Sequence, residues 1–480
     1  MTINDIYNTR PKFYKILPST GINKLNKIQI YQNDFLAELH PSGHKINDPL
    51  YYENIFKTVE KTDSKGNKYQ QVVEIAIAMQ QIILTKHLTH LCGKDIRFVY
   101  SGSNYTQVKK NLVKELKQGW IKKNMETAKY DFCKSVKATG DGAFCAVIDK
   151  GKFSYRVFSA LNGDGLHPVF GFDGKLKQFG RSFTAFDYEA GEEVLYMELW
   201  DNTYFSRYRY SLANKNADQD GWETETKPTP HGFNEIPIVY KKVDKGACWS
   251  DVQDLIDKLE MALSQLFENN KSYAFRIMVI KGGFEIQGDL RGQARAIMMD
   301  DTDGSAGFME KADASNSFTV QLEQTLKFIL MGSFTVLPPE VKGGDLPGVT
   351  IKILYSPAVE QGINDKNEYN SSIDEMVSLF KHGYGVELEQ VSDYDGLDVR
   401  GDIDVYVHQN DAEIISNINT SVLDGSLSVE TGAEKHPYAA SDEYDRLLKQ
   451  QREELTGTGG IETYKGEEDN TYNQQQAQTK

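Results

Sequence analysis

Cysteine is scarce in this chain of 480 residues. The four cysteines lie far apart in the sequence, at Cys92, Cys133, Cys145 and Cys248. Disulfide frameworks and zinc knuckles need closely spaced pairs, which this spacing does not supply. The scarcity therefore excludes a small cross-linked fold, and we expect reduced thiols in a cytoplasmic setting.

Several motifs are missing as well. No Gly-x-x-x-x-Gly-Lys-Ser/Thr sequence occurs, so a nucleotide-binding phosphate loop has no support. No uncharged apolar run approaches the roughly 20 residues that a membrane helix needs. The first residues, Met1–Asp5, lack the basic and apolar stretches of a signal peptide. We expect a soluble, intracellular protein that uses no cofactor.

Positive charge is also in deficit. The chain has 54 Lys and Arg against 69 Asp and Glu, a net charge of −15. Tight wrapping of DNA depends on neutralising phosphates, which this balance disfavours. The charge balance remains compatible with a protein that lets DNA pass without binding it tightly. With 39% hydrophobic and 11% aromatic residues the chain can bury substantial cores, and its length favours two or three domains.

Catalytic and metal-binding patterns are weak. The histidines show no nucleophile motif such as Gly-x-Ser-x-Gly. His87, His90 and Cys92 could bind a metal, but a fourth ligand is missing. Histidines on a helix surface near the helix end are the favoured interpretation. No metal site is predicted here.

Acidic turns form a second group of candidates. Residues 216–221 and 299–304 imitate calcium loops, yet each lacks one critical ligand. Asp300, Asp301 and Asp303 could in principle hold two metals for phosphodiester cleavage. Because no matching histidine or lysine set accompanies them, solvated turns are favoured.

Apolar periodicity predicts a mixed α/β (α+β) fold. Helical spacing covers 71–91, 108–136 as one or two helices, 251–273 and 317–331, and a long segment follows over 349–382. Strand-like spacing is clearest over 143–148, 153–157, 194–199 and 236–240. Ser250 is the expected N-cap of the helix that starts at Asp251.

The helices over 251–273 and 317–331 bracket a small insert. Strands are expected within it over 275–281, 296–299 and 307–311. Two amphipathic helices around such an insert can pack as a hairpin and leave the insert projecting.

The run Leu337–Gly348 is the most informative loop in the chain. Pro338 and Pro339 stop the preceding helix, because proline lacks an amide donor and clashes with the turn before it. Gly343 and Gly344 allow backbone angles that side chains forbid. The composition predicts a mobile finger between stiff elements.

Six local patterns follow one another along residues 70–455. They are a helix-Gly-Lys-x-Ile step at 90–96, a Gly turn at 137–144, a His-x-Phe strand at 231–239, a helix opening at 249–251, the loop exit at 343–349 and helices around a Glu-Thr turn at 417–443. In this order they resemble the portal proteins of tailed double-stranded-DNA bacteriophages, above all those of long-tailed phages.

The resemblance implies a division of the chain into named parts. Residues 1–249 would form the wing, with a long wing helix and a strand over 349–410. Stem helices would span 250–273 and 315–336, with the clip between them at 274–314. The tunnel loop would be 337–348 and the crown helices 411–455. Residues 456–480 are disordered on composition.

The resemblance also implies a non-enzymatic function. Family members form a ring, usually dodecameric, at one capsid vertex of the virion, after assembly in the host cytoplasm. DNA passes through during packaging, is retained and is later ejected. The implied partners are double-stranded DNA, the terminase motor, major capsid and scaffolding proteins, and neck or head-completion proteins, with no membrane. A separate terminase ATPase agrees with the missing phosphate loop.

Candidate channel residues follow from this placement. In the tunnel loop they are Lys342, Gly343, Gly344 and Asp345, and we expect Lys342 to touch phosphate transiently. The first stem helix carries acids that could repel DNA and keep it sliding: Asp251, Asp254, Asp257 and Glu260. Which of these face the channel is open, because positions three apart drift around a helix.

Some features depart from the family pattern. The β-branched run Val349–Leu354 by itself predicts a strand, and Pro357 should end or kink a helix. Two alternatives stay open: a metal-dependent phage nuclease that uses Asp300, Asp301 and Asp303, and another structural protein of the head or neck.

Overall fold

The computed structural model divides the chain into two compact units. One is formed by Met1–Val341 and Tyr355–Val407, and the other by Lys342–Leu354 and His408–Lys480. The residues that it describes are 59–62, 68–71, 75, 77–188, 191–211, 222–243, 246–274, 278–281, 284–286, 297–299, 305–308, 315–337, 348–407, 411–439 and 443–456. Residues 1–58 and the tail after residue 456 lie outside these ranges.

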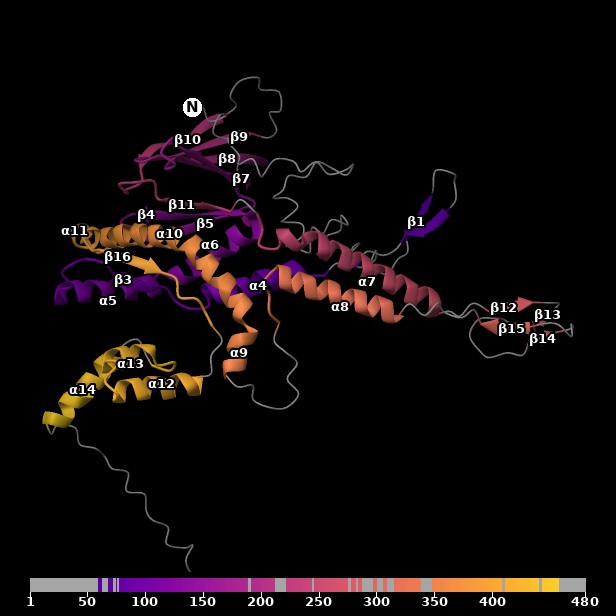
Figure 1. The fold of residues 1–480 in the computed structure, drawn as a ribbon. Coiled ribbons are helices and arrows are strands. Elements are labelled where there is room, and N and C mark those ends of the chain that lie inside the picture. Colours follow the sequence, from indigo (N-terminus) through magenta and orange to yellow (C-terminus); the bar gives the residue numbers. More distant parts are fainter. Residues whose placement is uncertain are drawn as a thin grey trace, which may run out of the picture. The chain divides into compact units, whose positions relative to one another are not determined.

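Antiparallel sheets build one side of the first unit (Figure 1). Three strands pair in the order β11-β4-β5, and five pair in the order β10-β9-β8-β7-β6. Their bounds are β4 Asp141–Asp149, β5 Lys152–Phe158, β6 Gly165–Phe170, β7 Leu176–Asp187, β8 Glu192–Trp200, β9 Tyr204–Ser211, β10 Trp222–Pro230 and β11 Ile238–Lys242. The predicted strands at 143–148, 153–157, 194–199 and 236–240 are confirmed, with small shifts at their ends.

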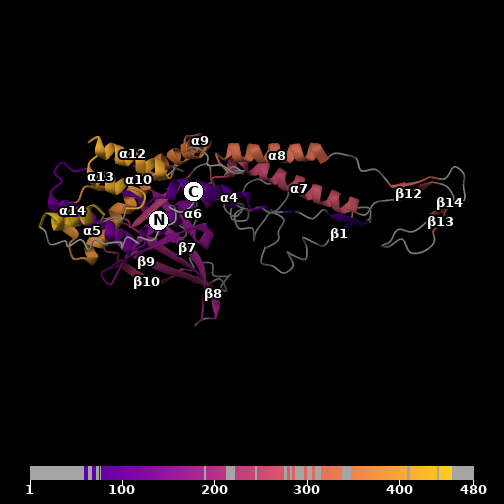
Figure 2. The same cartoon turned by 90° about the horizontal axis from the view of Figure 1, so that it is seen from below.

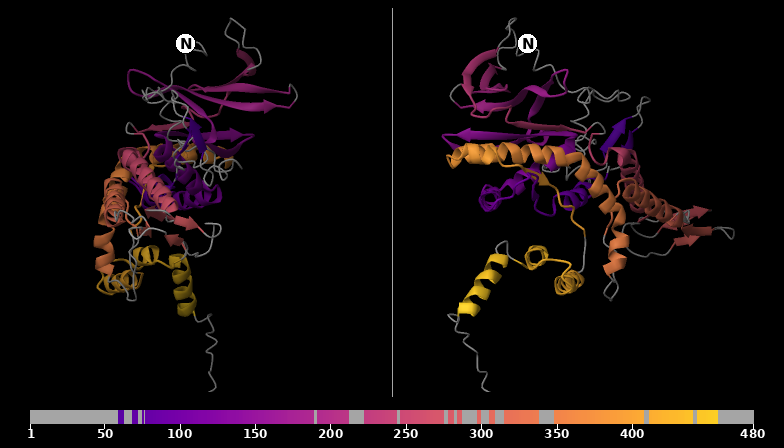
Figure 3. Two further views of the ribbon diagram at one scale, coloured as in Figure 1. Left: turned by 90° about the vertical axis from the view of Figure 1, so that its right-hand side faces the viewer. Right: turned by 60° about the vertical axis from the view of Figure 1, so that its left-hand side comes forward.

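Helices cover the face of the three-stranded sheet that the five-stranded sheet leaves open (Figure 1, Figure 3). They are α4 Met79–Cys92, α5 Gln107–Lys122, α6 Met125–Thr139, the long α10 Ser356–Glu387 and the short α11 Val391–Asp395. The predicted segment 108–136 is two helices, and Gly140 ends the second with a left-handed φ of 86°. A small sheet pairs β3 Arg97–Tyr100 with β16 Val399–Asp402.

Aromatic rings fill the core beneath α10. Trp120 and Phe153 meet Phe380 edge-on, with ring centroids 5.2 and 5.1 Å apart. Gly383 lies in the next turn, where an added Cβ would come within 2.3 Å of the Phe153 ring. The close approach of α10 to β5 therefore requires glycine at this position. A second apolar cluster, including Phe158, Phe179, Trp200 and Ile238, joins the two sheets.

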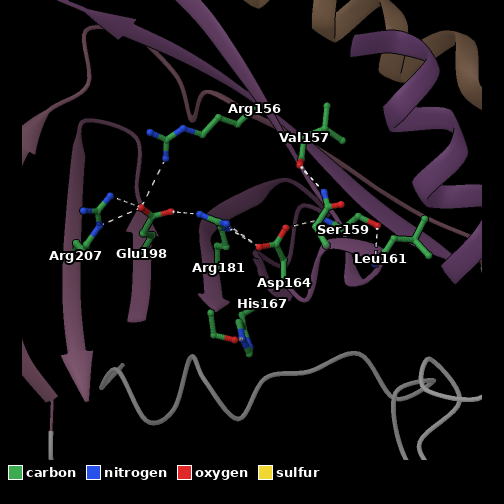
Figure 4. A network of polar contacts seen from close by, with 11 residues as sticks. Arg156, Val157, Ser159, Leu161, Asp164, His167, Arg181, Glu198 and Arg207 are labelled. Atoms are coloured by element: carbon green, nitrogen blue, oxygen red, sulfur yellow. Dashed lines mark hydrogen bonds and ion pairs between the residues drawn. The ribbon is translucent and has the colours of Figure 1, made fainter. Parts of the chain in front are cut away.

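An ionic network crosses the five-stranded sheet (Figure 4). The carboxylate of Glu198 in β8 is fully buried and pairs with Arg181 of β7 at 2.9 Å and with Arg207 of β9 at 2.7 Å. Arg181 also pairs with Asp164 at 2.7 Å. Because the charged groups come from neighbouring strands, the network fixes their register as well as neutralising the buried carboxylates.

Two helices run away from the sheet layers (Figure 1, Figure 2). A 3-10 turn over Ser250–Val252 leads into α7 Gln253–Ala274, and α8 Ser315–Gly332 lies beside α7. Between them β12 Met278–Lys281 pairs with β15 Ser305–Phe308, and β13 Phe284–Ile286 with β14 Ile297–Met299. The hairpin that brackets a strand-containing insert is confirmed.

The second unit is helical and is drawn in yellow for its C-terminal part (Figure 3). It contains α9 Gly348–Leu354, α12 Asp411–Leu423, α13 Val429–Lys435 and α14 Glu443–Thr456. Lys352 of α9 lies 3.6 Å from Glu413 of α12, and the Ser428 hydroxyl caps α13 by accepting from the Thr431 amide.

Two sequence-based predictions of local structure are wrong. Gln71 ends strand β2 (Lys68–Gln71), which pairs with β1 (Val59–Thr62), so α4 begins only at Met79. Val349–Leu354 is helical and not a strand. Pro357 does mark a helix boundary, because α9 ends at Leu354 and α10 begins at Ser356 with the proline in its first turn.

Candidate functional site

The hairpin of α7 and α8 is the first part of the candidate site. Ile256 and Leu259 of α7 and Ile329 of α8 belong to one buried cluster. Ile256 and Leu259 lie three residues apart, on one stripe of α7. Burial of apolar surface between this stripe and Ile329 holds the two helices together. The remaining faces of both helices are available to form a lining.

Acidic side chains occupy part of the outer face of this hairpin. Asp251, Asp254 and Asp257 are exposed. Glu260 differs, because it is only 5% exposed and its carboxylate accepts a 2.8 Å hydrogen bond from the amide of Ile77. One turn later the Ser264 hydroxyl accepts from the amide of Ile75 at 2.8 Å. Glu260 therefore anchors the segment that leads into α4, which removes it from the set of candidate channel acids.

The predicted loop residues Lys342, Gly343, Gly344 and Asp345 lie outside the described part of the chain. The segment before them is described and ends α8. The Thr335 amide donates to the Leu330 carbonyl at 2.8 Å, and Phe334 adopts a left-handed φ of 53°. This closure resembles a Schellman turn, which glycine usually forms, so a phenylalanine here stores backbone strain.

Helix α4 contacts the chain on both sides of that loop. The Nε2 of His87 donates to the Ser333 carbonyl oxygen at 2.7 Å, because a carbonyl can only accept. The Nδ1 of His90 donates in the same way to the Tyr406 carbonyl at 2.8 Å. The His90 ring also lies 6.4 Å from that of Tyr355, the residue before α10. Within one helical turn the two histidines thus bind the end of α8 and the segment after β16, and His90 also lies beside the residue before α10.

Burial controls the protonation of His87. Its side chain is 6% exposed, and burial, together with the nearby Lys137 cation, lowers its pKa to about 4. Lys137 of α6 and Asp365 of α10 form an ion pair of 2.8 Å in which both side chains are buried. The Gln361 amide donates to the same carboxylate at 3.0 Å. A neutral imidazole therefore lies beside a buried, paired charge at the base of the hairpin.

The interpretation of His87 and His90 as helix-surface histidines is wrong. Both side chains are buried, and each directs a ring nitrogen at a backbone carbonyl. Cys92 instead lies against Cys133 of α6, and a hydrogen bond between the two thiols contributes to the raised pKa of Cys133. Among the described residues, no three His, Cys, Asp or Glu side chains gather as metal ligands.

The remaining candidate sites lie outside the described ranges. These are Asp300, Asp301 and Asp303, and residues 216–221 of the first calcium-like loop. Within those ranges no helix is both long and apolar enough to cross a membrane.

Sequence reasoning missed the anchoring side chains. The pair His87 and His90, three apart on a helix, gave a signal of a shared face, but their partners lie hundreds of residues away. No sequence signal pointed to the pairing of Lys137 with Asp365 or of Glu198 with its arginines. A lysine or glutamate in an apolar neighbourhood looks like a surface residue until its partner is known.

A protein family and several solved structures are similar to this chain. The family model described as "Phage portal protein, SPP1 Gp6-like" matches residues 31–457. No curated protein matches the chain. Among solved structures, the neck of an empty GTA particle computed with C6 symmetry is 10% identical, with 76% of this chain and 88% of that chain covered at a TM-score of 0.38. The virion of a native gene transfer agent particle is 12% identical, covering 77% and 88% at 0.35. Scores this low carry no argument about the fold.

Proposed function

The chain belongs to the SPP1 Gp6-like phage portal protein family, and from this premise we propose how its parts form a channel for DNA. As a family member it is a structural, non-enzymatic component of the virion at the capsid portal vertex, where it forms the channel for DNA packaging and the connection to the neck. Family membership over 31–457 is the observation that carries this function and decides against the nuclease and the other head or neck protein.

The division into parts is our proposal. We assign 1–249 and 349–410 to the wing, 250–273 and 315–336 to the stem, 274–314 to the clip, 337–348 to the tunnel loop and 411–455 to the crown. The α7 and α8 hairpin with the paired strands β12 to β15 between its helices supports the stem and the clip. The motor and later the neck proteins would dock on the clip, and capsid and scaffolding proteins on the wing.

A ring of subunits, dodecameric by our proposal, would cover apolar side chains that the single chain exposes. On α7 these are Met261 and Phe267, and on α8 Phe328 and Met331, all between 47% and 63% exposed. Large exposed apolar residues on neighbouring helices are typical of surfaces that another chain buries. We therefore place the subunit contacts of the stem on these side chains.

The charged residues indicate which side chains would line the channel. Asp251, Asp254 and Asp257 are exposed, and acids around a bore would repel phosphates and let DNA slide. In the tunnel loop, Lys342 is the only base among prolines and glycines. We propose that it touches phosphate transiently, once per subunit around the ring, with Gly343, Gly344 and Asp345 beside it.

The mass and shape of the purified full chain test the ring. We expect particles of about twelve chains of 54.3 kDa with a central hole, measured by native mass spectrometry and negative-stain imaging. A discrete monomer or dimer at high protein concentration, with no ring even when scaffolding protein is added, would contradict it.

A further inference from the structure

One face of α5 carries unusual positive charge in a chain with a net charge of −15. Three lysines on this face are exposed: Lys110, Lys114 and Lys117. At about 100° per residue they form a row along the helix. The opposite face holds Leu116, Gly119 and Trp120, which are buried.

Two lysines of this face, Lys110 and Lys117, carry charge that no described carboxylate of the subunit neutralises. Glu115 is the one acidic residue of α5, and it lies beside the Tyr394 hydroxyl, whose pKa is raised by burial and by this carboxylate. Lys110 lies over the Tyr105 ring at 5.6 Å. Neither Lys110 nor Lys117 has a carboxylate at ion-pair distance among the residues that the structure describes. The lysine face therefore presents net positive charge to its surroundings.

Helix α10 carries the complementary charge. Glu360, Glu368 and Glu375 are exposed, and Glu235 lies close to Glu375. Burial and the nearby charges of Glu235 and Asp374 raise the pKa of Glu375. Lys241 lies 3.9 Å from Glu368 and offsets part of the charge. The acidic face, defined by these four glutamates, stays net negative.

The two faces point to opposite sides of the helix pair. Helix α5 turns Gly119 and Trp120 toward Tyr384 and Phe380 of α10. Phe380 and Tyr384 lie roughly half a turn around α10 from Glu368 and Glu375. The lysine face spans about 10 Å of helix from Lys110 to Lys117, and it fits within the acidic face, which spans about 22 Å from Glu360 to Glu375.

We propose that the lysine face of one copy docks on the acidic face of the next copy around the ring. A closed ring of identical chains needs two different, complementary surfaces on each chain, and these faces meet that need. The inference rests on the proposed ring and names the wing surfaces that orient it. Because exposed ion pairs contribute mainly to encounter rate and specificity, they guide assembly rather than supply most of its affinity.

Charge reversal in the full chain tests the inference. We expect Lys110→Glu with Lys117→Glu to lower the initial rate of ring formation by about tenfold at low salt, with the difference shrinking in high salt. Mass photometry measures the ring fraction over time. The matched control is Lys175→Glu with Lys177→Glu, which changes the net charge equally at the exposed turn before β7 and at the start of β7 and should leave the rate unchanged.

A charge swap separates docking from misfolding. The variant Glu368→Lys with Glu375→Lys should also assemble slowly. Mixed in equal amounts with the α5 variant, it should restore the parent rate, because every contact then joins opposite charges. Absence of rescue would overturn the inference.

Two other results would decide against it. If the parent forms rings and all variants match its rate, the inference fails while the ring stands; if the parent forms none, the proposed ring fails with it. Unchanged assembly together with lost retention of a short DNA duplex on a filter would assign the lysine face to DNA instead.

Discussion

The Nε2 atom of His87 in α4 donates a 2.7 Å hydrogen bond to the carbonyl oxygen of Ser333 at the end of α8. One turn along α4, His90 binds the Tyr406 carbonyl and lies beside Tyr355. One helical turn of α4 therefore holds the end of α8 and the segment after β16, which lie far apart in the sequence.

The stability of the protein should fall in mild acid because of His87. Its pKa is about 4 in the folded chain and 6.5 in the unfolded chain. Above pH 6.5 the imidazole is neutral in both states. As the pH falls from 6.5 toward 4, only the unfolded chain binds the proton, and the folded state loses up to about 3 kcal/mol.

Urea unfolding at pH 7.5 and pH 4.5 measures this loss. The variant His87→Gln keeps an amide donor for the Ser333 carbonyl but does not titrate. The free energy of unfolding of the parent should therefore fall more steeply with acid than that of the variant. Parallel pH profiles would show that His87 contributes nothing.

The ion pair between Lys137 and Asp365 predicts a strong single-mutant effect. Both side chains are nearly inaccessible and lie 2.8 Å apart. Lys137→Met leaves a buried carboxylate without its cation and should cost about 3–5 kcal/mol of unfolding free energy. Adding Asp365→Leu removes that carboxylate and should recover most of the loss. A double variant as unstable as the sum of the single ones would contradict the pairing.

The network around Glu198 makes a similar prediction in the sheets. Glu198→Ala leaves Arg181 and Arg207 without their shared carboxylate, and it should cost about 3–5 kcal/mol of unfolding free energy in thermal or chemical denaturation. Glu223→Ala is the control, because Glu223 pairs with Arg209 on the exposed edge of the same sheet. Its midpoint should stay close to that of the parent. Equal losses for the two variants would show that burial of Glu198 does not matter.

The tunnel-loop proposal predicts a functional change without a structural one. Lys342→Gln should form rings with a stability within about 0.5 kcal/mol of the parent, since loop substitutions seldom affect folding. Its rate of DNA packaging, measured with terminase and procapsids, should fall. Lys342→Arg keeps the charge and should package at nearly the parent rate. If the Gln variant packaged DNA like the parent, contact between Lys342 and phosphate would have no role.

Much of the fold could be predicted from local pattern. The helix over 317–331, the strands over 143–148 and 153–157, and the strand-containing insert between two helices all follow from spacing that repeats within a few residues. The family resemblance also came from short motifs in order. These features are encoded locally, so no distant contact is needed to recognise them.

Local pattern failed where another part of the chain decided the outcome. Val349–Leu354 has β-branched residues, yet it is helical. Gln71 continues an apolar helical pattern, yet it ends a strand that pairs with Val59–Thr62. Local propensity did not decide the outcome in either place.

The sequence by itself determined the charge balance, the helical hairpin around its insert, and the scarcity of cysteine and of phosphate-loop motifs, because each of these is a property of neighbouring residues. Only the tertiary structure decided that Glu260 is a buried anchor while Asp251, Asp254 and Asp257 stay exposed. It also decided that His87 and His90 bind the carbonyls of Ser333 and Tyr406. The reason is physical: burial and hydrogen-bond partners depend on residues far away in the chain, which spacing does not record.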